Sequence, residues 1–423
     1  MKIFLDTVGC RLNQSEIEHM AARFRDEGHE VVASAAEADL MVINTCTVTA
    51  AADADSRKKI RQAARSGVNQ IIATGCYATL QPERISQLPG VELVVANSRK
   101  EMLVEDALGT AFSQSKKILS RIPLPGQRKR TRAFIKVQDG CDNHCTFCIT
   151  RIARGKSVSR TMKEVFADVE FALAGGVKEI VLTGVNLGAW GKDLSAFSSL
   201  GALMRELISR YSPPRLRLSS LEPWDVNNEM IDAMQLPGVC GHLHLPLQSG
   251  CDEILQKMGR RTDTQTYKET VGKIRKKIPE VAVTTDIMVG FPGETETHFQ
   301  KSLEFVQRMA FTSGHVFRYS PRPGTPAAKL PDRIEAHVCK TRNRQMRELF
   351  TRLETNHQRK QLGQVLEVLW EKSEPSPAGW QLSGLSENFL RVAALADRNA
   401  YNEISGVRVE SIKNKKLFGE VLE

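Results

Sequence analysis

The sequence predicts an α/β protein of three parts: an N-terminal open parallel α/β sheet, a central full or partial (β/α) barrel, and a small C-terminal β-barrel. Apolar β-like runs alternate with amphipathic helical segments up to about residue 110, and the alternation resumes at a larger scale from residue 133. From residue 363 the chain changes to short strand-like segments separated by turn residues. We therefore expect parts at 1–112, 133–360 and 361–423, joined by a proline-bearing basic linker at 113–132.

The first part should hold a parallel sheet with helices on both faces, because strand-like and helix-like segments alternate along it. The strand-like segments are Lys2–Thr7, Leu40–Asn44, Gln70–Thr74 and Glu92–Ala96, and the helix-like segments include Asn13–Glu27 and Ala51–Ser66. All strands of such a sheet end at one edge, where the ligands of open α/β folds bind.

The central part should form a full or partial barrel, because five or six βα units fit into it. Its strand candidates are Ala133–Gln138, Glu179–Thr183, Leu216–Ser219, His242–Pro246, Ala282–Val289 and His315–Tyr319. A charged helical stretch, Pro331–Arg359, should close this domain. The C-terminal barrel should contain strands at Gln364–Trp370, Phe389–Val392 and Gly406–Ser411.

The composition is that of an ordinary globular protein, with 41% hydrophobic and 26% charged residues in 423. No apolar run approaches the roughly 18–20 residues that cross a bilayer, and the N-terminus lacks the apolar core and cleavage site of a signal peptide. We therefore expect a cytoplasmic protein without a membrane partner. In that compartment its nine cysteines should serve metal or redox chemistry rather than structural disulfides.

The net charge of +10 is concentrated in one stretch. Residues 113–160 hold twelve Lys/Arg against Asp139 and Asp142, and the difference, 12 − 2 = 10, equals the net charge of the whole chain. A local basic block suggests a polyanionic partner. A solvated linker would explain the charge run equally well.

One loop carries three cysteines at a spacing typical of an iron–sulfur site. Cys141, Cys145 and Cys148 follow a C-x3-C-x2-C pattern after the strand candidate Ala133–Gln138, at the expected mouth of the barrel. Three thiolates can hold a [4Fe–4S] cluster and leave its fourth iron open to chelate a small molecule. The alternative is a zinc knuckle that uses His144. Since His144 directly precedes Cys145, its side chain should point away from a shared metal, which favours the cluster.

Three more cysteines, Cys10, Cys46 and Cys76, each follow a predicted strand of the first part. Because parallel strands end at one edge of the sheet, these thiols should converge although they are far apart in the sequence. A second cluster with an open iron is then plausible, and the glycines before two of the cysteines, Gly9 and Gly75, favour it. The alternative is that each is a buried core cysteine. The other three cysteines show no pattern and are interpreted as incidental: Cys240, Cys251 and Cys339.

With these residues in hand, the chain resembles the radical S-adenosylmethionine (AdoMet) methylthiotransferases over essentially its whole length. The matching segments are Thr7-Val-Gly-Cys-Arg-Leu-Asn-Gln-Ser-Glu, Asn44-Thr-Cys-Thr-Val-Thr, Gly75-Cys-Tyr-Ala, Gln138-Asp-Gly-Cys-Asp-Asn-His-Cys-Thr-Phe-Cys-Ile, Leu182-Thr-Gly-Val-Asn-Leu-Gly, Arg217-Leu-Ser-Ser-Leu-Glu-Pro, His242-Leu-His-Leu-Pro-Leu-Gln-Ser-Gly and Thr285-Asp-Ile-Met-Val-Gly-Phe-Pro-Gly-Glu-Thr. The resemblance implies a cluster-bearing N-terminal domain, a radical AdoMet partial barrel and a C-terminal TRAM barrel that contacts the substrate.

The resemblance also implies two [4Fe–4S] clusters, one on each cysteine set, and two AdoMet molecules per turnover. The loop cluster would reduce AdoMet to a 5′-deoxyadenosyl radical that removes hydrogen from C2 of an adenine. The second cluster would hold the sulfur that is methylated and transferred. The residues that would orient AdoMet follow strands of the barrel: Thr183, Gly184, Asn186, Ser219, Glu222 and Asp286.

Three subfamilies compete, and they act on isopentenyladenosine in tRNA, threonylcarbamoyladenosine in tRNA, or an aspartate of a ribosomal protein. The segments that look like the threonylcarbamoyladenosine type are Gly9-Cys-Arg-Leu-Asn-Gln, Gly184-Val-Asn-Leu-Gly-Ala-Trp-Gly and Gly384-Leu-Ser-Glu-Asn-Phe-Leu-Arg-Val. The implied partners are the tRNA anticodon loop with its base 37, an electron donor and a sulfur source. A rival of a different class is a nucleic-acid-binding protein with structural clusters, but structural clusters normally have four ligands.

Two features depart from the family pattern. Cys251 replaces the serine that usually follows Gln-Ser-Gly. Residues 361–423 hold seven Lys/Arg and nine Asp/Glu, although a nucleic-acid module is expected to be basic. The main tRNA contact is therefore expected in the basic linker, at Arg128, Lys129, Arg130 and Arg132.

Overall fold

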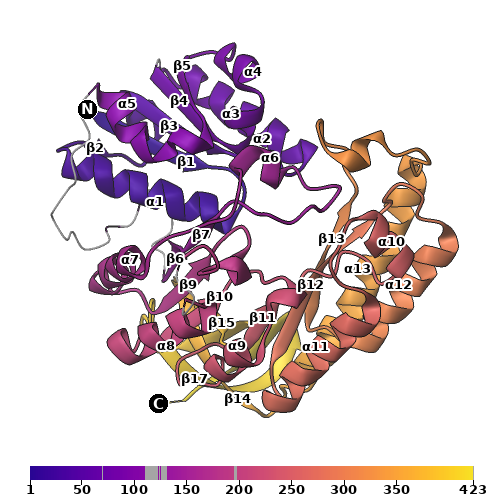
Figure 1. Cartoon of the computed structure of the whole chain (residues 1–423). Helices are drawn as coiled ribbons and strands as arrows, with labels where there is room; N and C mark the ends of the chain where they lie inside the picture. Colours follow the sequence, from indigo (N-terminus) through magenta and orange to yellow (C-terminus); the bar gives the residue numbers. More distant parts are fainter. Residues whose placement is uncertain (69, 110–121, 123, 125–130, 195–197, 423) are drawn as a thin grey trace.

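The computed structural model describes residues 1–422 except 69, 110–121, 123, 125–130 and 195–197 (Figure 1). An N-terminal α/β domain lies at the top of this view, a larger α/β core lies below it, and a β-barrel packs at the bottom, drawn in yellow. Arg128, Lys129 and Arg130, which we expected to bind tRNA, lie outside the described residues.

The N-terminal domain is a five-stranded parallel sheet in the order β2-β1-β3-β4-β5, which confirms the predicted parallel sheet. Its elements are β1 (Lys2–Thr7), α1 (Arg11–Asp26), β2 (Glu30–Val31), β3 (Leu40–Thr45), α2 (Ala50–Arg65), β4 (Gln70–Gly75), α3 (Cys76–Leu80), α4 (Pro82–Ser86), β5 (Val91–Val95), η2 (Asn97–Met102) and α5 (Leu103–Leu108). Separate hydrophobic clusters cover the two faces, with α1 and α5 on one and α2 and α3 on the other.

The core has six parallel strands in two sheets, β10-β9-β6 and β11-β12-β13, which isolated bridges join at Leu216–Val239 and Ser220–His244. Among the described residues, the two outer strands β6 and β13 do not pair with each other, so the barrel is partial. Its elements are β6 (Arg132–Lys136), β7 (Gln138–Asp139), α6 (Thr150–Arg154), β8 (Val158–Ser159), α7 (Met162–Ala174), β9 (Glu179–Thr183), η3 (Leu187–Ala189), α8 (Leu200–Tyr211), β10 (Arg215–Leu218), η4 (Pro223–Asp225), α9 (Asn228–Ala233), β11 (His242–His244), α10 (Asp252–Lys257), α11 (Thr264–Lys277), β12 (Ala282–Val289), α12 (Glu296–Met309), β13 (Ser313–Arg318) and α13 (Ala336–Arg359).

The C-terminal part is a closed barrel in the order β14-β15-β16-β18-β17. Its strands are β14 (Val365–Ser376), β15 (Gly379–Ser386), β16 (Arg391–Ala396), β17 (Ile404–Lys413) and β18 (Lys416–Val421). The sequence did not reveal β15 and β18, because each contains a glycine where the neighbouring backbone comes close. A Cβ on Gly384 or Gly419 would lie 2.3 Å from the Leu369 oxygen or 2.0 Å from the Arg408 oxygen.

Phe389, which we expected inside a strand, precedes β16 at a φ of +67°. Its ring stacks on His242 of the core with centroids 4.3 Å apart, and the Arg11 guanidinium lies 5.8 Å from its centre. Arg217 of β10 donates to the backbone oxygen of Glu387 at 2.8 Å. The C-terminal barrel is therefore anchored on the core beside Arg11, the residue that follows Cys10.

Candidate active site

The loop site lies on the segment that follows β7. Gly140 precedes Cys141 at a φ of +68°, and a Cβ there would lie 1.8 Å from the carbonyl oxygen of Lys156. Only glycine fits this turn, which brings the cysteine loop close to the chain entering β8. Burial, together with the nearby thiols of Cys148 and Cys145, raises the pKa of Cys141 to about 11.

The spacing of these thiols suits a cluster better than a single ion. Tetrahedral zinc holds sulfur at about 2.3 Å, which places two ligating sulfurs roughly 3.8 Å apart. In the described part of the chain, one His/Cys/Asp/Glu group brings three ligand atoms within 4.8 Å of one another, and it contains no cysteine of this loop. A [4Fe–4S] cluster binds each thiolate on a different iron, so it accepts a wider arrangement. The geometry therefore argues against the zinc knuckle.

A buried arginine that the sequence did not single out lies against this loop. The Arg260 guanidinium donates to Cys145 Sγ at 3.6 Å and to both carboxylate oxygens of Glu222 at 3.1 and 2.6 Å. It also lies 4.7 Å from the ring centre of Trp224. Burial opposes its charge, but Glu222 and Cys145 hold the pKa of Arg260 above its ordinary value. No local pattern reveals this contact, because Arg260 and Cys145 are 115 residues apart.

The carboxyl ends of β9 and β10 open beside the loop and carry most of the residues expected to orient AdoMet. Thr183 is the buried last residue of β9. A Cβ on Gly184 would lie 2.8 Å from Gln138 Oε1, which also accepts the amide proton of Asn186. Asn186 Oδ1 and Ser219 Oγ are buried and have no hydrogen-bond partner among the described residues. Such atoms are costly unless a ligand or water satisfies them, so they fit a small polar molecule bound here.

Glu222 and Asp286, the other two expected AdoMet residues, are placed differently. Glu222 follows β10 and is held by Arg260. Asp286 lies within β12 rather than after a strand, and its Oδ2 is 3.3 Å from His244 Nε2. The carboxylate is thus at mid-strand, next to the neighbouring strand β11.

The second cysteine set lies at the edge of the N-terminal sheet, after β1, β3 and β4. Gly9 has a φ of +109°, and a Cβ there would lie 2.8 Å from Cys46 Sγ, so glycine makes room for the thiol. Burial, together with the thiols of Cys10 and Cys76, raises the pKa of Cys46 to about 11. The three sulfurs are therefore neighbours. Like the loop thiols, these sulfurs do not belong to any group of three ligand atoms that lie within 4.8 Å of one another in the described residues.

The two cysteine sets lie on facing surfaces of the first two domains. Asn97 donates through Nδ2 to Cys76 Sγ at 3.7 Å and to the Ala153 oxygen in α6 at 2.8 Å. Helix α6 begins two residues after Cys148. On the other side, Arg322 of the core donates to Asp53 at 2.7 Å, close to Cys46. Segments of the core are thus tied directly to segments of the N-terminal domain that lie beside Cys76 and Cys46.

Arg154, the last residue of α6, is almost completely buried and also forms hydrogen bonds between the two domains. Its guanidinium donates to Glu16 at 2.9 Å, to Asp139 at 2.9 Å and to Asn13 Oδ1 at 2.7 Å. Burial would lower the pKa of Arg154, but Glu16, Cys76 and Asp139 raise it well above its ordinary value. A positive charge therefore lies beside the thiols of Cys10 and Cys76.

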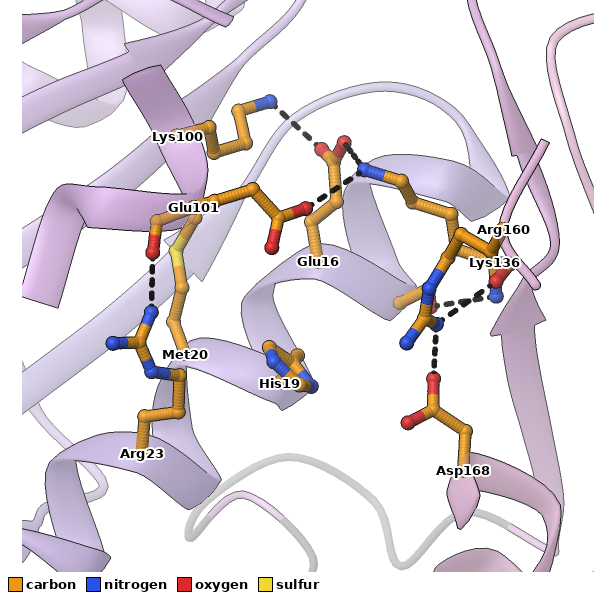
Figure 2. Close-up of a pocket in the computed structure, with 10 residues that line it drawn as sticks. Glu16, His19, Met20, Arg23, Lys100, Glu101, Lys136, Arg160 and Asp168 are labelled. Carbon is orange, nitrogen blue, oxygen red and sulfur yellow. Dashed lines mark hydrogen bonds and ion pairs between the residues drawn. The ribbon is translucent and has the colours of Figure 1, made fainter. Parts of the chain in front are cut away.

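Glu16 is the acceptor at the centre of this interface (Figure 2). Lys100 of the N-terminal domain lies 2.8 Å from its carboxylate and Lys136 of the core 3.6 Å, and both point toward it in the figure. Burial would raise the pKa of Glu16, but Lys100, Arg154 and Lys136 hold it well below its usual range. The sequence predicted α1 without showing that Glu16 faces the neighbouring domain.

Of the four linker residues expected to bind tRNA, Arg132 is described, and it forms an ion pair. Arg132, at the start of β6, lies 2.6 Å from Glu371 of the C-terminal barrel, and its side chain is 17% exposed. It helps to fix the barrel on the core, which competes with the tRNA contact that we expected from it.

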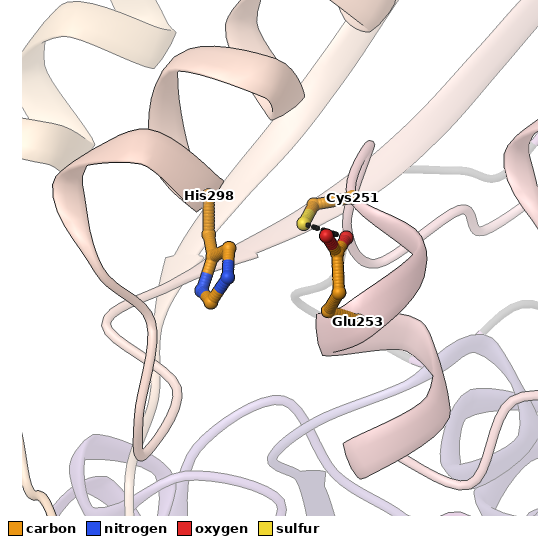
Figure 3. Close-up of side chains that lie close together, drawn as sticks. All are labelled: Cys251, Glu253 and His298. Carbon is orange, nitrogen blue, oxygen red and sulfur yellow. Dashed lines mark hydrogen bonds between the residues drawn. The ribbon is translucent and has the colours of Figure 1, made fainter.

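Among the described residues, Cys251 forms the one group of three possible metal ligands within 4.8 Å of one another, together with Glu253 and His298 (Figure 3). Its thiol donates to Glu253 Oε2 at 2.9 Å, while Lys301 holds the other oxygen at 2.6 Å. His298 Nδ1 accepts the backbone proton of Thr295. The three side chains are thus already satisfied, and a serine at 251 could make the same bond to Glu253. Cys240 and Cys339 are buried and lie in neither cysteine set.

No helix among the described residues is long and apolar enough to cross a bilayer. The family description "Uncharacterized protein family UPF0004" matches residues 2–96, and "Radical SAM superfamily" matches residues 135–306. In fold, the chain is similar to the radical S-adenosylmethionine methyltransferase TsrM from Kitasatospora setae, with a TM-score of 0.59 and 16% identity over 77% of each chain. Membership of the radical SAM superfamily implies AdoMet and a [4Fe–4S] cluster.

Curated relatives match nearly the full length. The threonylcarbamoyladenosine tRNA methylthiotransferase MtaB of Thermotoga maritima is 36% identical over 98% of this chain and 95% of the relative. Its namesake of Bacillus subtilis is 33% identical over 95% and 92%. The tRNA-2-methylthio-N(6)-dimethylallyladenosine synthase of Geobacter metallireducens is 31% identical over 99% and 98%. With such matches along its whole length, the chain belongs to the tRNA methylthiotransferases of the radical SAM superfamily.

Proposed function

We propose that this protein attaches a methylthio group to C2 of N6-threonylcarbamoyladenosine at position 37 of tRNA. The observation that carries the proposal is the pair of three-cysteine sets on facing domain surfaces, since sulfur transfer needs a radical site and a sulfur site close together. The choice of base rests on three relatives of 33–36% identity that are named for threonylcarbamoyladenosine.

Each cysteine set would hold one [4Fe–4S] cluster with an open iron. When bound, the cluster on Cys141, Cys145 and Cys148 and AdoMet would supply the radical that removes hydrogen from C2. The cluster on Cys10, Cys46 and Cys76 and a second AdoMet would supply the methylthio group. Asn186 and Ser219, beside Thr183 and Gly184, offer AdoMet buried polar atoms that have no hydrogen-bond partner among the described residues. Arg260 orients the Glu222 carboxylate at the same opening through two hydrogen bonds.

The substrate base must reach the opening between the domains, so the anticodon loop would present base 37 splayed from its neighbours. We assign the electrostatic contacts with tRNA to the basic linker, including Arg128, Lys129 and Arg130, and place the protein in the cytoplasm. The C-terminal barrel would serve as a TRAM-like module that positions the loop. An electron donor and a sulfur source must be supplied from outside the chain.

Mass spectrometry of nucleosides from cells lacking the protein tests the proposal. The expected result is loss of the methylthio form of threonylcarbamoyladenosine, with the unmethylthiolated nucleoside accumulating and the dimethylallyl nucleosides unchanged. Loss of methylthio-dimethylallyladenosine would assign the function of the relatives near 31–33% identity. Unchanged tRNA with loss of a methylthio-aspartate in a ribosomal protein would contradict a tRNA substrate. No change in either would favour structural clusters.

A further inference from the structure

A pocket that has no role in the proposed binding of AdoMet or the clusters opens next to the site of Cys141, Cys145 and Cys148. It has a volume of about 270 Å³ and lies between η3, η4 and the first turn of α8. These segments follow β9 and β10, so the pocket shares the carboxyl end of the core strands with the AdoMet residues. Its polar lining includes Lys192, Ser199, Trp224, Asp225 and Asn227.

Two residues that line this pocket each carry a buried polar atom that has no hydrogen-bond partner among the described residues. The indole nitrogen of Trp224 and Oδ2 of Asp225 are inaccessible and have no hydrogen bond to any described residue. The Asp225 side chain is only 2% exposed. A buried donor or acceptor without a partner costs about 1–3 kcal/mol, so a ligand that supplies an acceptor and a donor would recover this loss.

The position of Asp225 depends on a glycine of the neighbouring segment. A Cβ on Gly188 would lie 2.3 Å from Cβ of Asp225 and 2.9 Å from its free Oδ2. The other oxygen of Asp225 accepts from Lys192 Nζ at 2.6 Å. The Lys192 side chain is 62% exposed, so its ammonium can turn toward a ligand while Asp225 stays fixed. The lining therefore offers one cation, one buried N–H donor and one buried carboxylate oxygen.

The pocket is close to the radical site, because a single side chain spans the distance between them. Arg260 contacts Cys145 Sγ at 3.6 Å and lies 4.7 Å from the Trp224 ring centre. In adenine, C2 and the carbon that bears N6 are separated only by N1, so a base whose C2 faces the loop site could extend its N6 substituent into this neighbouring pocket.

We infer that this pocket binds the threonyl arm of the substrate base and selects for it. The Lys192 ammonium pairs with the threonyl carboxylate, the Trp224 N–H donates to the carbamoyl oxygen, and Asp225 Oδ2 accepts the threonyl hydroxyl proton. A dimethylallyl group has none of these groups and would leave both buried atoms unpaired, which is a strong basis for rejection. The inference rests on the proposed function and adds the residues that set its specificity.

The test compares two anticodon stem–loops, one with threonylcarbamoyladenosine at position 37 and one with plain adenosine. Binding of each is measured with the reconstituted holoenzyme, its Lys192→Met and Trp224→Phe variants, and Lys163→Met as an exposed-lysine control on α7. Phenylalanine keeps an aromatic ring beside Arg260 but has no N–H. Lys192→Met and Trp224→Phe should each reduce the preference for the modified loop by roughly tenfold to a hundredfold, the range of a lost charge-assisted or buried hydrogen bond. The control should keep the wild-type preference.

Two different failures are distinguishable. If wild-type enzyme methylthiolates threonylcarbamoyladenosine in tRNA while both pocket variants keep the wild-type preference, the pocket assignment alone is overturned. If wild-type enzyme instead makes no methylthio product on that base, the proposed function falls and the pocket assignment falls with it.

Discussion

The two cysteine sets show two ways to bring three thiols together. The loop set is local, because Cys141, Cys145 and Cys148 lie within eight residues and one turn at Gly140 positions them. The edge set is assembled by topology, since Cys10, Cys46 and Cys76 meet only when three parallel strands end at one edge. Loss of local geometry should therefore affect only the loop set, whereas the edge set also depends on the packing of the whole sheet.

The largest expected effect is replacement of the loop cysteines. Changing Cys141, Cys145 and Cys148 to Ala should abolish AdoMet cleavage and product formation, and should lower the iron content from about eight to about four per chain. Anaerobic reconstitution followed by iron analysis and detection of 5′-deoxyadenosine measures both. Retained AdoMet cleavage would show that the loop set does not bind the cofactor.

Replacement of the edge cysteines should separate the two activities. With Cys10, Cys46 and Cys76 changed to Ala, the enzyme should lose about half its iron and all methylthio product but still cleave AdoMet reductively. The reason is that radical formation needs only the loop set, while sulfur insertion needs both. Methylthiolated nucleoside from this variant would make the edge cysteines structural.

A third prediction concerns Glu16, which ties the domains together between the two sets. Glu16→Gln leaves Lys100, Arg154 and Lys136 without their shared carboxylate, and breaking such a buried pair costs about 3–5 kcal/mol. Because the pKa of Glu16 is depressed, its stabilisation is fully present above its unfolded pKa and is lost as the pH falls through the lowered value. The difference between wild type and variant in urea unfolding should therefore shrink in acid.

The matched control is Lys277→Met, which removes a surface ion pair with Asp232. That change should alter the free energy of unfolding by less than about 0.5 kcal/mol. Equal effects of the two variants would mean that the domain interface contributes little to stability.

The next largest effect is expected from replacing Gly75, which lies beside the edge set and not the loop set. Gly75 has a φ of +98°, and a Cβ there would lie 2.3 Å from the Thr45 oxygen, whereas Gly67 has a φ of +94° and nothing within 4 Å. Gly75→Ala combines backbone strain of about 1–3 kcal/mol with a clash beside Cys46 and Cys76. It should reduce iron at the edge set and lower Tm further than Gly67→Ala does. Identical iron contents would show that the edge tolerates a displaced strand.

Local signals explain which parts the sequence could predict. The ends of β1, β9 and β12 follow the apolar runs, and the predicted ranges agree with the structure. The C-x3-C-x2-C loop was evident for the same reason. Contacts between distant segments, such as Arg260 with Cys145 or Glu16 with Lys136, leave no periodic pattern. Asp286 was grouped with residues that follow strands, although the predicted strand Ala282–Val289 already contained it, and the structure places it inside β12.

The last prediction uses a feature that the two cysteine sets share: each has one buried arginine. Arg154 adds positive potential at Cys10 and Cys76, and Arg260 contacts Cys145. A nearby positive charge favours the reduced, more negative state of a cluster, so its removal should lower the reduction potential. At a separation of about 6 Å and an effective dielectric constant of about 20, one charge contributes roughly 3 kcal/mol, on the order of 100 mV.

In redox titrations followed by electron paramagnetic resonance, Arg154→Met should lower the potential of the edge cluster and Arg260→Met that of the loop cluster. Arg154→Lys and Arg260→Lys keep the charge and should shift each potential far less. If each Met variant moved both clusters equally, the arginines would act through the fold rather than through their charge.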